Sequence, residues 1–150
     1  MLVYRISKCK YIEELSGLGA ATYGDRWSGK GTYIVYTAQN PSLALLESVV
    51  HISKIAGMSY CMVTLDIPDD NILDIRLPDL PAGRENNPPA EMLKEFGNKF
   101  VREGKYLAMK VPSAILFEES NILLNPNHRD FEKVKIVSKR SLAIDERLLL

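Results

Sequence analysis

The amino-acid sequence predicts a single α+β domain. Short runs rich in β-branched and aromatic residues outnumber the helical segments, and the two kinds do not alternate regularly as they would in a doubly wound sheet. The 150 residues suit one domain with its own hydrophobic core. No internal repeat and no linker divides the chain, so we expect residues 1–150 to fold as one unit with mixed or antiparallel sheets and a few helices.

The predicted strands are runs of three to eight apolar, β-branched and aromatic residues. They comprise residues 2–6, 32–37, 60–67, 72–75, 106–111, 115–117, 121–124 and 134–137. Two loops are expected between them, one over residues 15–31, which hold five glycines, and a proline-rich one over residues 77–89. A glycine-rich segment as long as the first is more often functional than idle in a compact domain.

The first predicted helix begins at Pro41. Asn40 is a favourable N-cap, and proline is favoured at the first helical position. We expect this helix to run to about Ile55, with Gly57 ending it.

The second predicted helix covers residues 91–102. Met92, Phe96 and Phe100 recur at the four-residue spacing of one helix face, so they are expected on its apolar side. Gly104 follows as the residue that ends the helix.

The charge and the termini of the chain exclude several classes. Lys+Arg and Asp+Glu both number 19, so the formal net charge is zero, which argues against direct binding of nucleic acid. A neutral protein is less protected against association, which mildly favours a partner or a homodimer. The N-terminus lacks the apolar run of a signal peptide, and no stretch approaches the roughly 20 apolar residues of a membrane span. We therefore expect a cytoplasmic protein that does not enter a membrane.

The cysteines and histidines predict no metal site. Cys9 and Cys61 lie far apart and outside any CxxC motif, so we interpret them as free thiols of a reducing compartment. His51 and His128 are the only histidines, and neither has a second ligand at zinc-binding spacing.

Residues 24–30, Gly-Asp-Arg-Trp-Ser-Gly-Lys, match the first seven positions of a P-loop. The eighth position must be Ser or Thr to hold magnesium, but it is Gly31. A predicted strand follows where a P-loop needs a helix. A P-loop is therefore not expected here.

Glu47 is the residue that a purely structural interpretation explains least well. On the predicted helix it shares a face with Leu43 and His51, and Leu46 and Val50 lie beside it. A carboxylate amid so much apolar surface must be paired, protonated or facing a cleft. A buried structural ion pair and a functional acid are equally compatible with this position.

Three further residues are candidates for a site. Arg26 lies in the glycine-rich segment beside Trp27, and a guanidinium fork there suits a phosphate, although an arginine stacked on Trp27 is the alternative. Tyr36 ends a predicted strand, where a core tyrosine is the alternative. Ser113 follows Pro112 in a turn, where a structural turn serine is the alternative.

Several segments resemble, in order, the RES domain family, the toxins of RES–Xre toxin–antitoxin systems, named after their Arg, Glu and Ser. The resemblance covers nearly the whole chain. The segments are Tyr4-Arg5, Gly19-Ala20, residues 24–31, Val35-Tyr36-Thr37-Ala38, Leu43-Ala44-Leu45-Leu46-Glu47, Val111-Pro112-Ser113-Ala114, Asn125-Pro126-Asn127-His128 and Asp145-Glu146-Arg147.

This resemblance implies a fold similar to ADP-ribosyltransferases, with NAD as substrate in a cleft between sheets and no other cofactor. It implies depletion of NAD by hydrolysis or phosphorolysis, or transfer of ADP-ribose to a protein, and inhibition by a helix-turn-helix antitoxin of the Xre type. A non-catalytic nucleotide-binding module built on the loop of Arg26 is the alternative from another class.

The resemblance also implies roles for the candidate residues. Glu47 suits the developing positive charge near the ribose. Arg26 suits the diphosphate, with Arg5 assisting. Tyr36 would stack on nicotinamide or orient the ribose, and Ser113 would bind the nicotinamide amide or position Glu47.

Overall fold

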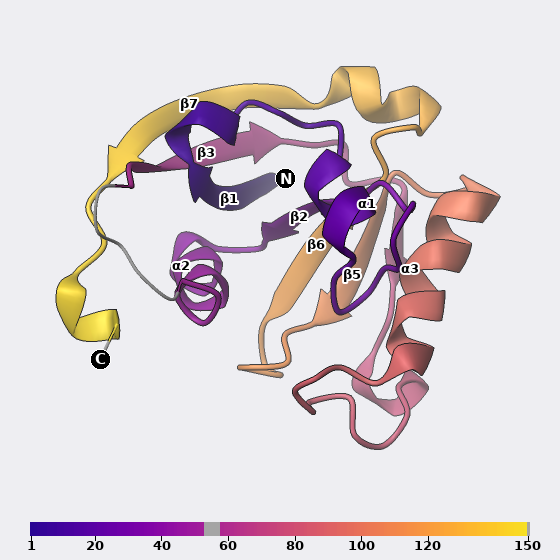
Figure 1. Ribbon diagram of the computed structural model, residues 1–150. Coiled ribbons are helices and arrows are strands. Elements are labelled where there is room, and N and C mark those ends of the chain that lie inside the picture. The colour runs from indigo at the N-terminus through magenta and orange to yellow at the C-terminus, as the bar shows by residue number, and fades with distance from the viewer. Residues whose placement is uncertain (53–57, 150) are drawn as a thin grey trace.

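The computed structural model describes residues 1–52 and 58–149, which form one α+β domain around a seven-stranded sheet (Figure 1). This confirms the predicted fold class. The strands lie in the order β4-β5-β6-β2-β1-β3-β7, and every neighbouring pair is antiparallel except β4 with β5. They are β1 (Leu2–Lys8), β2 (Val35–Ala38), β3 (Tyr60–Asp66), β4 (Ile72–Asp74), β5 (Ala108–Pro112), β6 (Ser120–Leu124) and β7 (Lys135–Leu142).

Besides the strands, the described residues form three α-helices and four short 3-10 turns. The helices are α1 (Leu18–Tyr23), α2 (Pro41–Val49) and α3 (Glu91–Glu103). The 3-10 turns are η1 (Cys9–Tyr11), η2 (Leu77–Asp79), η3 (Arg129–Lys133) and η4 (Glu146–Leu149). No helix in the described part of the chain is long and apolar enough to cross a bilayer.

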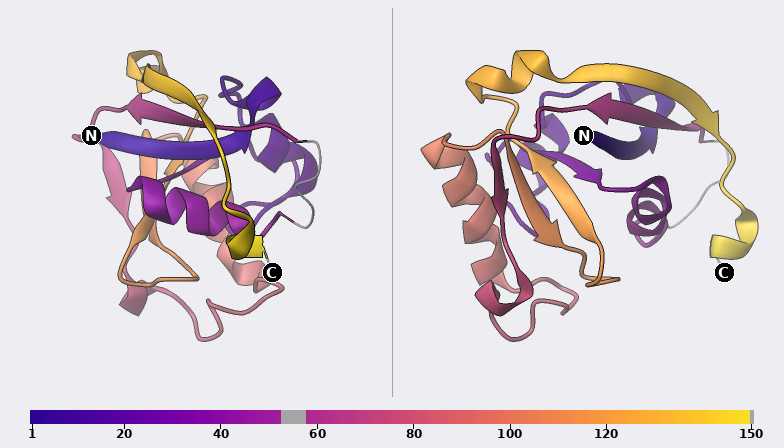
Figure 2. Two further views of the ribbon diagram at one scale, coloured as in Figure 1. Left: turned by 90° about the vertical axis from the view of Figure 1, so that its left-hand side faces the viewer. Right: turned by 180° about the vertical axis from the view of Figure 1, so that it is seen from behind.

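The sheet is strongly bent where β1 meets β2. These two strands share a single register pair, Tyr4 with Ala38, whereas β1 pairs with β3 over seven residues. The strands β1, β3 and β7 therefore run across the direction of β5 and β6, as Figures 1 and 2 show. In both figures α2 lies on the inner side of this bend, and α3 covers the outer side of β5 and β6.

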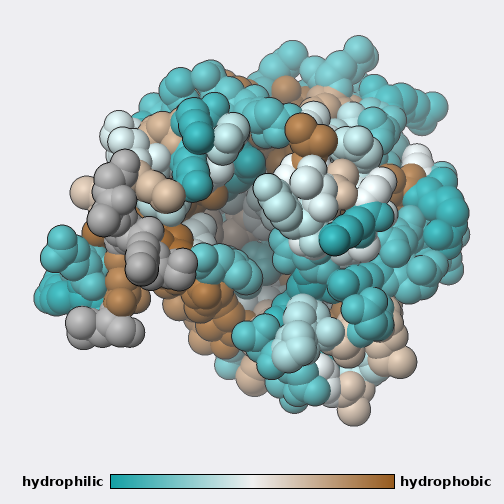
Figure 3. All heavy atoms as spheres, in the orientation of Figure 1, coloured by the Kyte–Doolittle hydropathy of each residue, from teal (hydrophilic) through white to brown (hydrophobic). Residues whose placement is uncertain are grey.

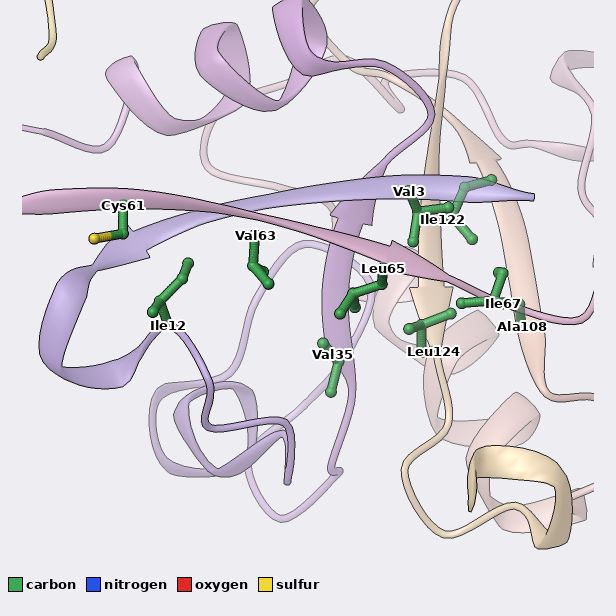
Figure 4. Packing of buried hydrophobic residues seen from close by; sticks show 10 residues of the cluster. All are labelled: Val3, Ile12, Val35, Cys61, Val63, Leu65, Ile67, Ala108, Ile122 and Leu124. Carbon is green, nitrogen blue, oxygen red and sulfur yellow. The ribbon is translucent and has the colours of Figure 1, made fainter. Parts of the chain in front are cut away.

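The strand β6 lies between β5 and β2, and its residues 122–124 are buried on both faces. Ile122 and Leu124 point into one apolar cluster, shown in Figure 4, together with Val3, Val35 and Leu65. Leu123 points the opposite way, into a second cluster beneath α3. Successive side chains of a strand face opposite sides, so β6 joins the two cores.

Both predicted helix starts are confirmed, and the start of α2 has a strong local signal. The Asn40 side chain accepts a hydrogen bond from the backbone N–H of Leu43 at 2.8 Å, and Pro41 is the first helical residue. The helix ends at Val49, earlier than predicted. The predicted endpoints Ile55 and Gly57 lie outside the described residues.

The second predicted helix is also confirmed. Of the three residues predicted on its apolar face, Phe100 is buried and Phe96 packs against the buried cluster beneath α3, but the prediction for Met92 is wrong. Gly104 takes the left-handed conformation, with φ 59°, that ends α3. Met92 is 57% exposed, and Leu93 and Gly97 are buried in its place, together with the predicted Phe100.

Three other predictions of local structure need correction. The segment 15–31 is not wholly irregular, because it contains α1. The strand predicted over residues 32–37 begins only at Val35. Residues 115–117 form part of a turn rather than a strand.

The prediction of free thiols is wrong in the structure. Cys9 and Cys61 form a disulfide with a Cα–Cα distance of 4.8 Å. Cys9 begins η1 and Cys61 lies in β3, so the bond ties the end of β1 to its neighbouring strand. The inference of a reducing compartment loses its basis in these residues.

Candidate functional site

A cleft of about 800 Å³ lies on the inner side of the bend. Figure 3 shows the molecule hollowed at the centre of this face. The cleft is lined from β1, β2 and α2 and from the turn that carries Arg26. Four of the predicted site residues line it together, namely Arg5, Arg26, Tyr36 and Glu47. A cleft of this size is in the range of sites that take a cofactor-sized molecule.

Glu47 reaches the cleft from the last turn of α2 and is half-buried. One carboxylate oxygen, Oε1, accepts a hydrogen bond from the Ser113 hydroxyl at 2.7 Å and another from the Asn121 amide at 2.7 Å. The two donors come from adjacent strands, since Asn121 is the second residue of β6 and Ser113 directly follows β5. Glu47 is therefore paired with neutral donors and also faces the cleft.

Ser113 is 3% exposed and does not line this cleft. Its hydroxyl donates to Glu47 and accepts from the backbone N–H groups of Ile115 at 3.0 Å and Leu116 at 3.1 Å. A serine hydroxyl has one donor and two acceptor positions, so all three are in use. This arrangement favours positioning of Glu47 over direct binding of a nicotinamide amide.

Arg26 lies in the turn of residues 24–29, which we call the arginine loop. Asp25 and Ser28 form a backbone bridge across its base, and the Asp25 carboxylate accepts from the backbone N–H of Arg26 at 2.7 Å. The guanidinium Nη1 donates to the carbonyls of Arg84 at 3.1 Å and Asn86 at 3.0 Å. Its remaining N–H groups are available for a ligand phosphate, since a guanidinium has five.

The arginine loop is fastened to α3. Trp27 is buried and packs edge-on against Phe96 of α3, with ring centroids 6.0 Å apart. The side-chain carbonyl of Asn98, also on α3, accepts from the backbone N–H of Gly29 at 3.0 Å and from the hydroxyl of Thr32 at 2.8 Å. Trp27 therefore anchors the loop in the core.

Tyr36 turns its hydroxyl toward the buried side of the arginine loop. It lies 2.8 Å from the hydroxyl of Ser28, which is fully buried. Burial raises the pKa of the Tyr36 phenol well above its usual range, and the carboxylate of Asp25 adds to this shift. The phenol thus stays protonated at neutral pH.

Arg5 lies on β1, which forms one wall of the cleft, and stabilises that wall. Its Nη1 donates to the carbonyls of Tyr11 at 3.2 Å and Ile12 at 3.0 Å. Burial lowers the pKa of the Arg5 guanidinium, and the charge of Glu14 partly opposes this. The geometry therefore gives Arg5 a structural task in holding η1, in addition to a place on the cleft wall.

Asn121 and Lys94 are among the polar residues of the cleft that sequence reasoning missed. Asn121 opens a predicted strand, and nothing local distinguishes it from a turn residue. Lys94 lies in α3 beside Glu91, with which it forms an i,i+3 ion pair of 3.1 Å. No group of three potential metal ligands occurs within residues 1–52 and 58–149.

Comparison with known proteins bears on the family and the fold of the chain. A "Toxin Res" of Yersinia enterocolitica is 34% identical over 151 residues and covers 99% of each chain. A "Prs ADP-ribosylating toxin" of a Sphingobium species is 33% identical over 142 residues, covering 91% of this chain and 88% of its own. A crystal structure of the MbcT–MbcA toxin–antitoxin complex of M. tuberculosis has a chain with the same fold, with a TM-score of 0.80 at 17% identity, covering 95% of this chain and 84% of that one. The RES domain model matches residues 2–145, and the chain therefore belongs to the RES domain family.

Proposed function

We propose that this protein is a toxin that cleaves the nicotinamide–ribose bond of NAD. The observation that carries the proposal is Glu47, fixed through one carboxylate oxygen at the wall of a cleft that Arg26 and Tyr36 also line. Relatives named as toxins, one of them an ADP-ribosylating toxin, support both parts of it.

The reaction suits these residue types. Breaking the bond builds positive charge on the ribose, and nicotinamide leaves as a neutral base, so no general acid is needed. Glu47 would stabilise that charge with the carboxylate oxygen that Ser113 and Asn121 do not bind. Electrostatic stabilisation by one fixed group is commonly worth roughly 3–4 kcal/mol. The N–H groups of Arg26 that do not contact Arg84 and Asn86 would bind the diphosphate.

The acceptor of ADP-ribose is the open part of the proposal. Water would give ADP-ribose and a proton, and inorganic phosphate would give the 1-phosphate of ADP-ribose. A protein acceptor would make the enzyme a mono-ADP-ribosyltransferase. The name of the Sphingobium relative favours this alternative function. Mass spectrometry of the product, with and without phosphate and cell lysate, separates the three.

The similarity to a chain of a toxin–antitoxin complex supports a protein inhibitor. We propose that this inhibitor is a helix-turn-helix antitoxin of the Xre type, and that toxin and antitoxin meet in the cytoplasm, where NAD is consumed. A homodimer stays a prediction, which light scattering of the purified protein tests.

The decisive experiment is release of free nicotinamide from NAD by the purified protein and its Glu47→Gln variant. Glutamine keeps a carbonyl oxygen that can accept from Ser113 and Asn121, so the fold should persist. It removes the charge, so turnover should fall by about 10²–10³-fold. Glu103→Gln, at the exposed end of α3, is the matched control and should retain full activity.

Two results would contradict the proposal. Unchanged NAD loss in Glu47→Gln would remove Glu47 from the reaction. NAD that binds to the wild-type protein without releasing nicotinamide would instead indicate a non-catalytic nucleotide-binding module.

A further inference from the structure

We infer that Asn121 is a positioning residue that fixes the rotamer of Glu47, so that the carboxylate presents its second oxygen to the substrate. This inference rests on the proposed function, because it assigns a role within the same site. Asn121 lines the cleft, whereas its partner in this task, Ser113, does not.

The hydrogen bonds define the orientation of both side chains. Glu47 Oε1 accepts from Asn121 Nδ2 and from Ser113 Oγ, each at 2.7 Å. An ionised carboxylate can only accept, so the Asn121 amide must turn its nitrogen toward Glu47. Both hydrogen bonds fall on one oxygen, which leaves Oε2 as the one directed away from them.

The support comes from a strand that is paired on both sides. Asn121 pairs with Ala38 of β2 on one side and with Val111 of β5 on the other, so its backbone is held from both edges. Glu47 itself stands on α2, a helix of nine residues on the other wall. A glutamate side chain loses rotamer freedom when it is fixed, and two short hydrogen bonds can offset this loss.

Neither donor can be replaced by the other. The Ser113 hydroxyl also accepts from two backbone N–H groups of its own turn, so its direction is set by residues 115–116. A single hydrogen bond would let the carboxylate swing about the Ser113 contact, whereas a second donor from β6 fixes its plane. A misplacement of about 1 Å in a reacting group can cost roughly 10²-fold in rate.

The test is the variant Asn121→Leu, which nearly keeps the side-chain volume and removes the donor. We expect kcat for nicotinamide release to fall by about 10- to 100-fold, with KM for NAD changed by less than about threefold, because Glu47 acts on the transition state rather than on binding. Asn127→Ala, at an exposed position of the turn after β6, is the control and should match the wild type. Asn121→Ala is the second variant if the leucine impairs folding.

A double-mutant cycle with Glu47→Gln shows whether Asn121 acts through Glu47. If it does, Asn121→Leu should lower kcat much less in the Glu47→Gln background than in the wild type. Full additivity of the two losses, or a kcat for Asn121→Leu within twofold of wild type, would overturn the inference.

A crystal structure of Asn121→Leu provides a readout that does not depend on activity. We expect the Glu47 carboxylate to have moved, or to adopt more than one rotamer. An unmoved carboxylate would overturn the inference even in an active enzyme. Absence of nicotinamide release from the wild type would instead refute the proposed function.

Discussion

Replacing Gly97 by alanine tests whether α3 sets the position of the arginine loop. Gly97 lies on the buried face of α3, directly against the backbone of Trp27. A Cβ at this position would lie 1.9 Å from the Trp27 carbonyl oxygen, 2.9 Å from the carbonyl carbon and 3.1 Å from Cδ1 of Ile34. The nearest contact is 1.1 Å short of the 3.0 Å below which real Cβ contacts are essentially never found, so helix and loop must separate.

Two effects of opposite sign contribute to the outcome. Alanine favours a helix interior over glycine by about 1 kcal/mol. Overpacking a tight contact costs about 1–3 kcal/mol, and here the obstacle is backbone, which cannot rotate away as a side chain can. We expect the clash to win, with a net loss of about 1–2 kcal/mol and a decrease of a few degrees in Tm. Because Arg26 directly precedes Trp27, KM for NAD should rise as well.

Differential scanning calorimetry and NAD kinetics on the same preparations give both quantities. The matched control is Gly19→Ala in α1, where a Cβ meets nothing within 4 Å and Tm should be unchanged or raised. A Gly97→Ala variant as stable as the wild type would refute the reasoning. A less stable variant with unchanged KM would show that α3 supports the fold without placing Arg26.

Three further predictions concern stability. Asn40→Ala removes the N-cap of α2 and should lower the free energy of unfolding by about 0.5–2 kcal/mol in urea titrations, whereas Asn40→Asp should preserve it. Cys61→Ser should lower the stability of the oxidised protein by about 2–4 kcal/mol, and the difference should vanish when the wild type is reduced. Tyr36 has a higher pKa in the folded than in the unfolded state. Its contribution to the free energy of unfolding is therefore fully present below about pH 10 and is lost as the pH rises further. Tyr36→Phe should therefore show a weaker fall in urea midpoint between pH 9 and pH 11, and an equal fall would contradict the assignment.

Local signals predicted the elements that local chemistry determines. The pair Asn40-Pro41 marks the start of α2, because the cap bonds a backbone N–H only three residues away. Gly104 marks the end of α3 for a similar reason. The apolar run 115–117 is not the strand that its composition predicts, because the Ser113 hydroxyl binds two of its N–H groups and stabilises a turn in which these side chains are exposed.

Contacts between distant segments could not be predicted in the same way. Helical spacing indicated that Glu47 needs a partner or a cleft, but Asn121 lies 74 residues further along the chain. Cys9 and Cys61 are separated by 52 residues and meet only because β1 pairs with β3. Such partners depend on strand order and register, which the pattern of a single sequence does not determine.

The hydrogen bonds of Arg26 to the carbonyls of Arg84 and Asn86 create a thermodynamic linkage. A ligand that immobilises the guanidinium also stabilises this distant segment, and reciprocally, anything that orders the segment strengthens binding of the ligand by the same factor. Amide hydrogen exchange around residues 84–86 would report occupancy of the cleft from outside it. A protein that binds residues 84–86 would change the affinity of the cleft for its ligand without entering the cleft.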